Sequence, residues 1–274
     1  MYREFYGFKE NPFNVTSDPH FLFMSKRHKE AFSHLRYGID ERKGFLVITG
    51  EIGTGKTTLC RALLNTLGDN VSTSFIINPN LSEIQMLKAI LGDFGVDPLK
   101  RTKFDLFRQL NSFLLEELRQ NRNVALIIDE AQNLRATVLE QIRLLSNLET
   151  EKEKLLQIVL IGQPQLRQKL DLPQLEQLKQ RVAVSYHLYP LDKNEVSEYI
   201  DHRLRVAGYE GGSIFTETAV QMIAEHSKGI PRIINILCDR ALLTGFVYES
   251  KEIDREMIEK GVYDVDGHLV GASN

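Results

Sequence analysis

The 274-residue sequence has no tryptophan, only two cysteines, and no apolar run long enough to cross a membrane. A spanning helix needs about 18 or more apolar residues in succession, and the dense apolar run at Val124–Ile128 is far shorter. Two cysteines form neither a disulfide framework nor a four-cysteine zinc site. The amino terminus carries charges and aromatic residues where a signal peptide needs an unbroken apolar stretch. These absences exclude secreted, disulfide-rich and membrane-spanning classes and predict a cytoplasmic protein.

The sequence also has no large excess of charge of either sign, since 34 Lys and Arg against 37 Asp and Glu give a net charge of −3. Proteins that bind nucleic acid through its phosphates commonly carry an excess of Lys and Arg. The composition therefore does not favour DNA as the partner. Hydrophobic residues make up 42% of the chain, which excludes a disordered chain and allows a globular core.

Short apolar runs alternate with helical patterns up to Leu188. The runs are rich in β-branched residues and mostly unalternating, as in strands covered on both faces; they are Phe45–Thr49, Thr73–Asn78, Val124–Ile128, Leu156–Ile161 and Val182–Leu188. Apolar residues at helical spacing fall between them, over Lys56–Leu67, Ser82–Phe94, Phe104–Gln120 and Leu134–Leu148. Strands that alternate with helices indicate an α/β fold with a parallel sheet.

The strand patterns stop at Pro190, and the patterns that follow are helical. They cover Asn194–Val206, Thr216–His226, Pro231–Tyr248 and Asp254–Gly261, separated by glycines. We therefore expect an α/β domain over residues 1–190 and a small all-helical domain over residues 191–262. Residues 263–274 are expected to form a flexible tail.

The segment Gly50–Thr58, GEIGTGKTT, contains the complete pattern G-x-x-x-x-G-K-[ST]. Gly53 and Gly55 let the backbone curl so that successive N–H groups point at phosphate oxygens, and the following helix adds its positive end. Lys56 is expected to reach the β- and γ-phosphates, and the Thr57 hydroxyl to bind Mg²⁺. The segment lies between a predicted strand and a predicted helix, as this motif requires. The expected nucleotide-binding residues are Gly53, Thr54, Gly55, Lys56, Thr57 and Thr58.

Two acids follow the apolar run Val124–Ile128, namely Asp129 and Glu130. Ligands of open α/β sheets bind beyond the carboxyl ends of the strands, where both carboxylates are expected to lie. Asp129 is expected to hold Mg²⁺, through water or via Thr57. Glu130 is expected to be the base that polarises the attacking water. The alternative is an ordinary strand followed by an acidic helix cap.

Further polar residues are placed to act on the γ-phosphate. Gln163 follows a predicted strand and is expected to touch both the γ-phosphate and the water, or else to cap the helix that begins at Pro164. Arg181 precedes the last strand, where a cation can serve a neighbouring subunit as an arginine finger or complement a helix dipole. Arg143 is the second candidate for that contact. Arg232 starts a helix of the second domain and either reports the γ-phosphate to it or lies on the surface.

Together these motifs resemble an AAA+ ATPase of the ExeA/GspA type (general secretion pathway protein A). The resemblance runs from Tyr6 to about Gly261 and is carried by Tyr6–Phe13, Asp129–Leu134, Ile142–Glu149, Ile161–Leu166, Gln180-Arg181 and Gly229–Asn235, together with the phosphate-binding segment. It implies a three-layer P-loop NTPase core followed by a helical lid. It also assigns the sensor-1 role to Gln163, the arginine finger to Arg181 and the sensor-2 role to Arg232, and it places Asn11–Phe13 near the adenine.

The resemblance implies an ATP-hydrolysing protein that forms a ring or filament with shared active sites. Such a protein would power or regulate assembly of a bacterial secretion or envelope system through a protein partner, which could also hold it at the inner membrane. Members of the family usually continue into a membrane span and a peptidoglycan-binding domain, and neither is found in these 274 residues.

Two alternatives remain open. One is an ATP-switched DNA-binding regulator of the transposition or replication-initiator type, which the basic residues at Lys100–Lys103 allow and the net charge opposes. The other is an ATP-dependent scaffold that binds without hydrolysis, against which Glu130 and Gln163 argue. The aromatic residues of Tyr2–Phe13 either pack on the protein or cover the nucleotide.

Overall fold

The computed structural model of the chain describes residues 1–77, 79–99, 102–151 and 153–270, with the backbone alone over 263–270. The chain folds as two compact units. The sheet unit consists of Lys26–Glu51 and Leu59–Leu188. The helical unit consists of Met1–Ser25, Ile52–Thr58 and the chain from Tyr189 onward.

The sheet unit is built on five parallel strands in the order β2-β3-β4-β1-β5. The strands are β1 (Phe45–Gly50), β2 (Val71–Ile76), β3 (Asn123–Ile128), β4 (Gln157–Gly162) and β5 (Val182–Leu188). β1, β3 and β4 are buried along their whole length, as unalternating apolar strands should be. The predicted strands and the parallel sheet are confirmed, although Asn78, predicted to end one strand, lies outside the described residues.

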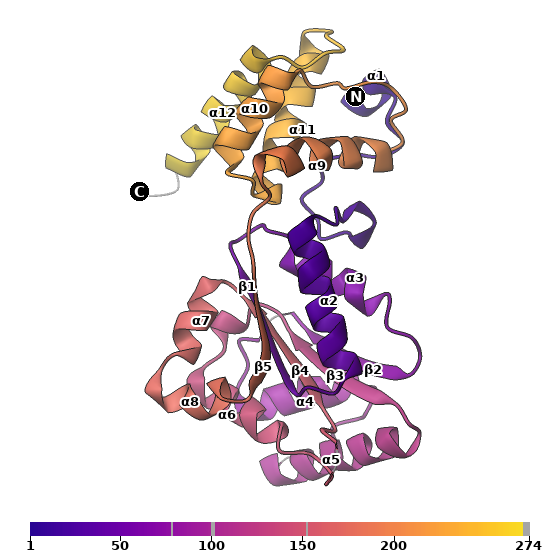
Figure 1. Cartoon of the computed structure of the whole chain (residues 1–274), viewed down its shortest axis with the longest axis vertical. Helices are drawn as coiled ribbons and strands as arrows, with labels where there is room; N and C mark the ends of the chain where they lie inside the picture. The colour runs from indigo at the N-terminus through magenta and orange to yellow at the C-terminus, as the bar shows by residue number, and fades with distance from the viewer. Residues whose placement is uncertain (78, 100–101, 152, 271–274) are drawn as a thin grey trace. The chain divides into compact units, whose positions relative to one another are not determined.

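Helices cover both faces of this sheet (Figure 1). α2 (Lys26–Asp40) lies against β1 and β5, so closely that a Cβ on Gly38 would fall 2.0 Å from Leu46 Cδ2. α4 (Glu83–Asp93), α5 (Lys103–Arg119), α6 (Ala136–Leu145) and α7 (Pro164–Leu170) share one apolar core with the other face. The unit also contains most of α3 (Lys56–Leu64), the short α8 (Glu176–Lys179), and the 3₁₀ helices η2 (Ala131–Asn133) and η3 (Pro173–Leu175).

The helical unit contains α9 (Lys193–Val206), α10 (Glu217–Ser227), α11 (Pro231–Val247) and α12 (Arg255–Val270), together with α1 (Tyr2–Tyr6) and the 3₁₀ helix η1 (Pro19–Phe21). Tyr6, Phe8 and Phe13 are buried in one core with apolar residues of α9, α10 and α11. Of the two alternatives for the amino-terminal aromatics, packing on the protein therefore holds for these three. No helix among the described residues combines the length and apolar character needed to span a membrane.

The units differ from the expected domains at both ends of the chain. Met1–Ser25 groups with the carboxy-terminal helices, not with the α/β core to which residues 1–190 were assigned. The reason is the packing of its aromatic residues in the helical core. Residues 263–270, expected as a tail, continue helix α12, whereas 271–274 lie outside the described residues. The division into a core domain and a lid domain stays a prediction.

Arg203 of α9 ties the amino-terminal segment to the helices. Its buried guanidinium donates from Nε to the Pro12 carbonyl at 2.5 Å and from Nη2 to the Asn14 carbonyl at 3.0 Å. It also lies 4.3 Å from the centre of the Phe21 ring. Burial lowers the pKa of Arg203 below its ordinary value. Carbonyl oxygens and an aromatic ring therefore take the place of water around this cation.

Replacing Arg203 with Ala should lower the free energy of unfolding by about 3 kcal/mol, because two carbonyls lose a charged donor. Denaturant titration measures this, and limited proteolysis within Met1–Ser25 reports local release of the segment. Arg205→Ala is the matched control, since Arg205 is exposed on the same helix and donates to the Asp201 carbonyl at 3.3 Å. Equal stability of the two variants would contradict the anchoring role of Arg203.

Candidate functional site

The carboxyl ends of three neighbouring strands form the edge at which Asp129, Glu130 and Gln163 lie. β3, β4 and β1 are adjacent in that order. Asp129 and Glu130 follow β3, Gln163 follows β4, and β1 ends at Gly50, where the glycine-rich segment begins. Because all strands of a parallel sheet end at the same edge, the sheet places Asp129, Glu130 and Gln163 at the edge where β1 also ends.

The glycine-rich segment between β1 and α3 has the backbone that its motif predicts. Gly53 (φ 82°) and Gly55 (φ 91°) both lie in the left-handed region that glycine adopts readily. Thr54 is fully buried, and Lys56, the first residue of α3, is 7% exposed. Thr57 and Thr58 follow in the first turn of the helix. A tight glycine turn that leads into a helix amino terminus is the arrangement that binds phosphate.

Arg232 lies against this segment within the helical unit. Its backbone N–H, in the first turn of α11, donates to the Gly53 carbonyl at 3.2 Å. A Cβ on Gly53 would fall 2.5 Å from Arg232 Cβ. The side chain of Arg232 is exposed, and its action on a γ-phosphate stays a prediction.

Glu130 is held by two glutamine amides. Its Oε2 accepts hydrogen bonds from Gln132 Nε2 at 2.5 Å and from Gln163 Nε2 at 3.2 Å. Gln132 Oε1 in turn accepts the Gln163 backbone N–H at 3.0 Å. Glu130 has a left-handed φ of 51°, a conformation that costs a residue with a Cβ about 1–2 kcal/mol. Strained backbone of this kind is common where a side chain must point in one direction.

Asp129 lies at the same strand end and is 2% exposed. Its Oδ1 accepts the Glu130 N–H at 2.9 Å. Burial raises the pKa of the Cys60 thiol in α3, and the nearby Asp129 carboxylate raises it further, so α3 runs close to this carboxylate. The predicted metal-binding pair, the Asp129 carboxylate and the Thr57 hydroxyl, offers only oxygen donors, and such donors suit Mg²⁺.

The capping interpretations of Glu130 and Gln163 are wrong. Glu130 occupies the N-cap position of η2 and Gln163 that of α7, yet neither side chain makes a cap hydrogen bond. The two side chains instead bond to each other. Gln132 is the residue of this cluster that motif reasoning missed. Its signals in the sequence are its place two positions after Glu130 and its presence in the segment Asp129–Leu134, which carries part of the family resemblance.

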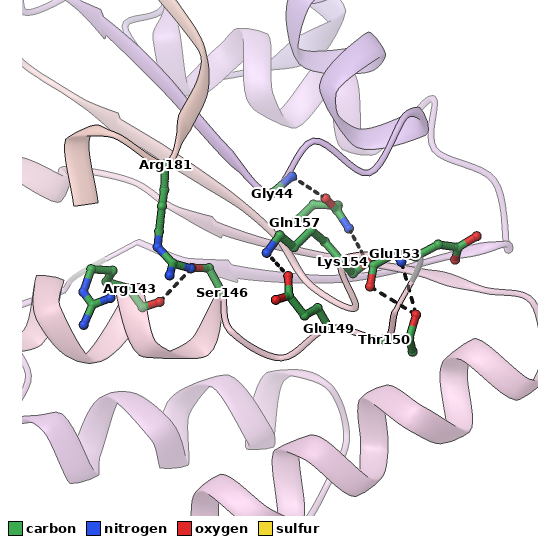
Figure 2. A network of polar contacts seen from close by, with 9 residues as sticks. All are labelled: Gly44, Arg143, Ser146, Glu149, Thr150, Glu153, Lys154, Gln157 and Arg181. Atoms are coloured by element: carbon green, nitrogen blue, oxygen red, sulfur yellow. Dashed lines mark hydrogen bonds and ion pairs between the residues drawn. The ribbon is translucent and has the colours of Figure 1, made fainter. Parts of the chain in front are cut away.

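Arg181 lies at the opposite end of the strands, at the edge of the sheet where the strands begin. It directly precedes β5, whose first residue Val182 pairs with Phe45 at the start of β1. Its Nη1 donates to the Ser146 hydroxyl at 2.9 Å, and that hydroxyl donates to the Arg143 carbonyl at 2.7 Å, as Figure 2 shows. The structure therefore separates Arg181 from Glu130 and Gln163 within one subunit.

The same edge carries a polar network around Gln157, the first residue of β4 (Figure 2). Gln157 is fully buried, and its Oε1 accepts the Gly44 N–H at 2.8 Å. Its Nε2 donates to the Lys154 carbonyl at 3.1 Å and to Asn123 Oδ1 at 3.4 Å. One side chain thus links the starts of β1, β3 and β4, which fixes the edge from which Arg181 projects.

Arg143, the second candidate for a contact to a neighbouring subunit, pairs with its own helix. Its Nη2 donates to Glu140 Oε1 at 2.7 Å, and its side chain is 13% exposed. The hydrogen bond from Arg143 holds the pKa of the Glu140 carboxyl below its usual range. Arg181 makes a single side-chain hydrogen bond among the described residues. Arg181 therefore has more donors left for a partner than Arg143.

The chain is similar in sequence to known proteins. Residues 39–170 match the family model described as "AAA domain". The chain is 45% identical over 271 residues to General secretion pathway protein A of Aeromonas hydrophila, covering 97% of this chain and 49% of that protein. The chain therefore spans about half the length of this curated relative.

Solved structures are similar over most of the chain. Cdc6p from Pyrobaculum aerophilum gives a TM-score of 0.66 at 17% identity, covering 90% of this chain and 70% of that one. The Walker-type ATPase of Pyrococcus abyssi gives 0.63 at 17% identity, covering 92% and 78%. At identities this low, the solved structures show the fold alone. These structures confirm the predicted fold class, an AAA+ α/β fold with a parallel five-stranded sheet and carboxy-terminal helices.

Gly53→Ala should weaken ATP binding roughly tenfold or more, since a left-handed φ costs a residue with a Cβ about 1–2 kcal/mol. The clash of its Cβ with Arg232 Cβ at 2.5 Å adds to that cost. Titration with a fluorescent ATP analogue measures the affinity. Gly92→Ala in α4 is the control, because a Cβ there meets no atom within 4 Å. Equal affinity of the two variants would show that the glycine turn does not form the phosphate site.

Proposed function

Because the chain is an AAA-domain protein similar to General secretion pathway protein A, we propose that it binds ATP with Mg²⁺ and hydrolyses it. The reaction would take place at the edge where β1, β3 and β4 end. The observation that carries the proposal is the hydrogen-bonded pair Glu130–Gln163 at this edge, beside the strand that leads into the phosphate-binding segment. A scaffold that only binds nucleotide would have no use for this pair.

The phosphates are held by the glycine-rich segment. Its N–H groups and the first turn of α3 face the anion, and the Lys56 ammonium offsets the charge of the β- and γ-phosphates. The Thr57 hydroxyl and the Asp129 carboxylate are the residues that would hold Mg²⁺, which neutralises phosphate charge when bound. Arg232 joins this set through the contact of its backbone with Gly53.

Water activation falls to Glu130 and Gln163. Oε2 of Glu130 is occupied by two amide donors, which leaves Oε1 to accept a proton from the attacking water. The water oxygen bonds to the γ-phosphorus, and the bond from that phosphorus to the bridging oxygen breaks, releasing ADP. The amide of Gln163 orients the water against the γ-phosphate.

Arg181 requires a second copy of the chain. β5 has 7 residues, so Arg181 lies roughly 20 Å from the carboxyl edge of its own sheet, at about 3.3 Å per residue. We therefore propose a head-to-tail ring or filament in which Arg181 of one copy reaches the nucleotide edge of the next.

The similarity to General secretion pathway protein A supports a role in powering or regulating a bacterial secretion or envelope assembly through a protein partner.

Glu130→Gln should lower ATP turnover by about 100-fold or more, because a general base contributes roughly 10²–10⁴ in rate. ATP binding should persist, whereas Lys56→Ala should lose it. Turnover is measured by phosphate release and binding by nucleotide titration. Glu151→Gln, an exposed acid near the opposite edge, is the control. Undiminished hydrolysis by Glu130→Gln would exclude this residue as the base.

Mixing two inactive variants tests the shared site. Glu130→Gln retains Arg181, and Arg181→Ala retains Glu130, so a mixed assembly contains complete sites at some interfaces. Random head-to-tail mixing at equal amounts should restore roughly a quarter of the wild-type turnover. Phosphate release by the mixture, set against each variant alone, is the measurement. A mixture no more active than its parts would show that Arg181 does not act across the interface.

A further inference from the structure

Gln132 links the ends of two strands through both atoms of its amide. Its Nε2 donates to Glu130 Oε2 at 2.5 Å, and its Oε1 accepts the Gln163 backbone N–H at 3.0 Å. Glu130 follows β3 and Gln163 follows β4. The Gln132 amide is therefore hydrogen-bonded through its nitrogen to Glu130, the predicted base, and through its oxygen to the backbone of Gln163.

The backbone of Gln132 is fixed independently of its side chain. The Lys169 ammonium, from α7, donates to the Gln132 carbonyl and to the Leu134 carbonyl, the latter at 2.8 Å. This cation thus binds the turn that follows Glu130 to the helix that follows Gln163. With its backbone held, Gln132 presents its amide from a defined position.

The end of β4 is shaped to admit this amide. A Cβ on Gly162 would fall 2.7 Å from Gln132 Oε1 and 3.0 Å from Leu166 Cδ2. The φ of Gly162 is not in the left-handed region, so backbone conformation does not require a glycine here. Space for the glutamine amide is a requirement that does explain it.

The two oxygens of the Glu130 carboxylate have different surroundings. Oε2 accepts both glutamine amides, while Oε1 has no hydrogen bond to any residue that the structure describes. Glu130 is partly exposed, so water reaches the carboxylate. With Oε2 bonded to two amides, Oε1 is the oxygen that can accept a proton from water.

We propose that Gln132 is a positioning residue that holds the Glu130 carboxylate in the orientation required for ATP hydrolysis. This inference rests on the proposed ATPase function. Gln132 acts through Glu130 and does not itself touch the nucleotide. Loss of its amide should therefore affect turnover and leave nucleotide binding unchanged.

Gln132→Ala and Gln132→Glu test the proposal by separate routes. The first removes the amide, and the second keeps the length of the side chain but replaces the donor with a like charge. Each should lower kcat by about 10–100-fold, because small misplacements of a catalytic group cost this much, with KM and the ATP dissociation constant unchanged. Asn133→Ala, at the neighbouring exposed position, is the control and should match the wild type.

Gly162→Ala provides a second test that leaves Gln132 itself intact. Its Cβ would displace the Gln132 amide, and the same loss of kcat at unchanged nucleotide affinity is expected. Circular dichroism and thermal unfolding establish that each variant is folded. A kcat for Gln132→Ala equal to or above that of the wild type would overturn the proposal, even if Glu130→Gln is inactive.

A crystal structure of Gln132→Ala with a non-hydrolysable ATP analogue gives a readout independent of turnover. The Glu130 carboxylate should leave the position that it takes in the wild-type protein with the same analogue. An unmoved carboxylate would overturn the role of Gln132. If the wild-type protein does not hydrolyse ATP, the proposed function fails, and this comparison still decides whether Gln132 positions Glu130.

Discussion

The parallel pairing of β1, β3 and β4 in adjacent positions is the constraint on which the candidate site depends. Asp129, Glu130, Gln163 and Arg181 all lie just outside the strands: the first three follow a strand, and Arg181 precedes one. Register along the fully buried strands then sets where these residues meet. Gln163 becomes a neighbour of Glu130 and Gln132 because β3 pairs with β4, although it lies 33 and 31 positions after them in the sequence.

The same constraint gives the sheet two chemically different edges. Carboxylates, amides and the start of the glycine-rich segment lie at the carboxyl edge. The amino edge carries Arg181, held by Ser146, and the buried amide of Gln157 that links three strand starts. A β-strand is stiff and its length is fixed by its residue count. The sheet therefore keeps Arg181 and Glu130 apart in one copy, and this separation motivates the proposed assembly, in which one copy would complete the site of another.

The features that the sequence alone predicted are those set by residues close together in the chain. The strands followed from their apolar runs, and the left-handed Gly53 and Gly55 from a motif that requires them. Two features depend on contacts distant in sequence, and local patterns do not encode these. Met1–Ser25 joins the helical unit because its aromatics and carbonyls meet α9 and α11. Gln132 bonds to the Gln163 backbone only because β4 lies beside β3 and leaves space for the amide beside Gly162.

The central proposal is that two copies of the chain share each catalytic site. One copy supplies Glu130 at the carboxyl ends of its strands, and the neighbouring copy supplies Arg181 from the amino ends of its own strands. ATP turnover per subunit, measured across a range of protein concentrations, tests it most directly. The account predicts that turnover per subunit rises with concentration and levels off as assembly is completed. Turnover per subunit that stays constant from dilute to concentrated protein would contradict it.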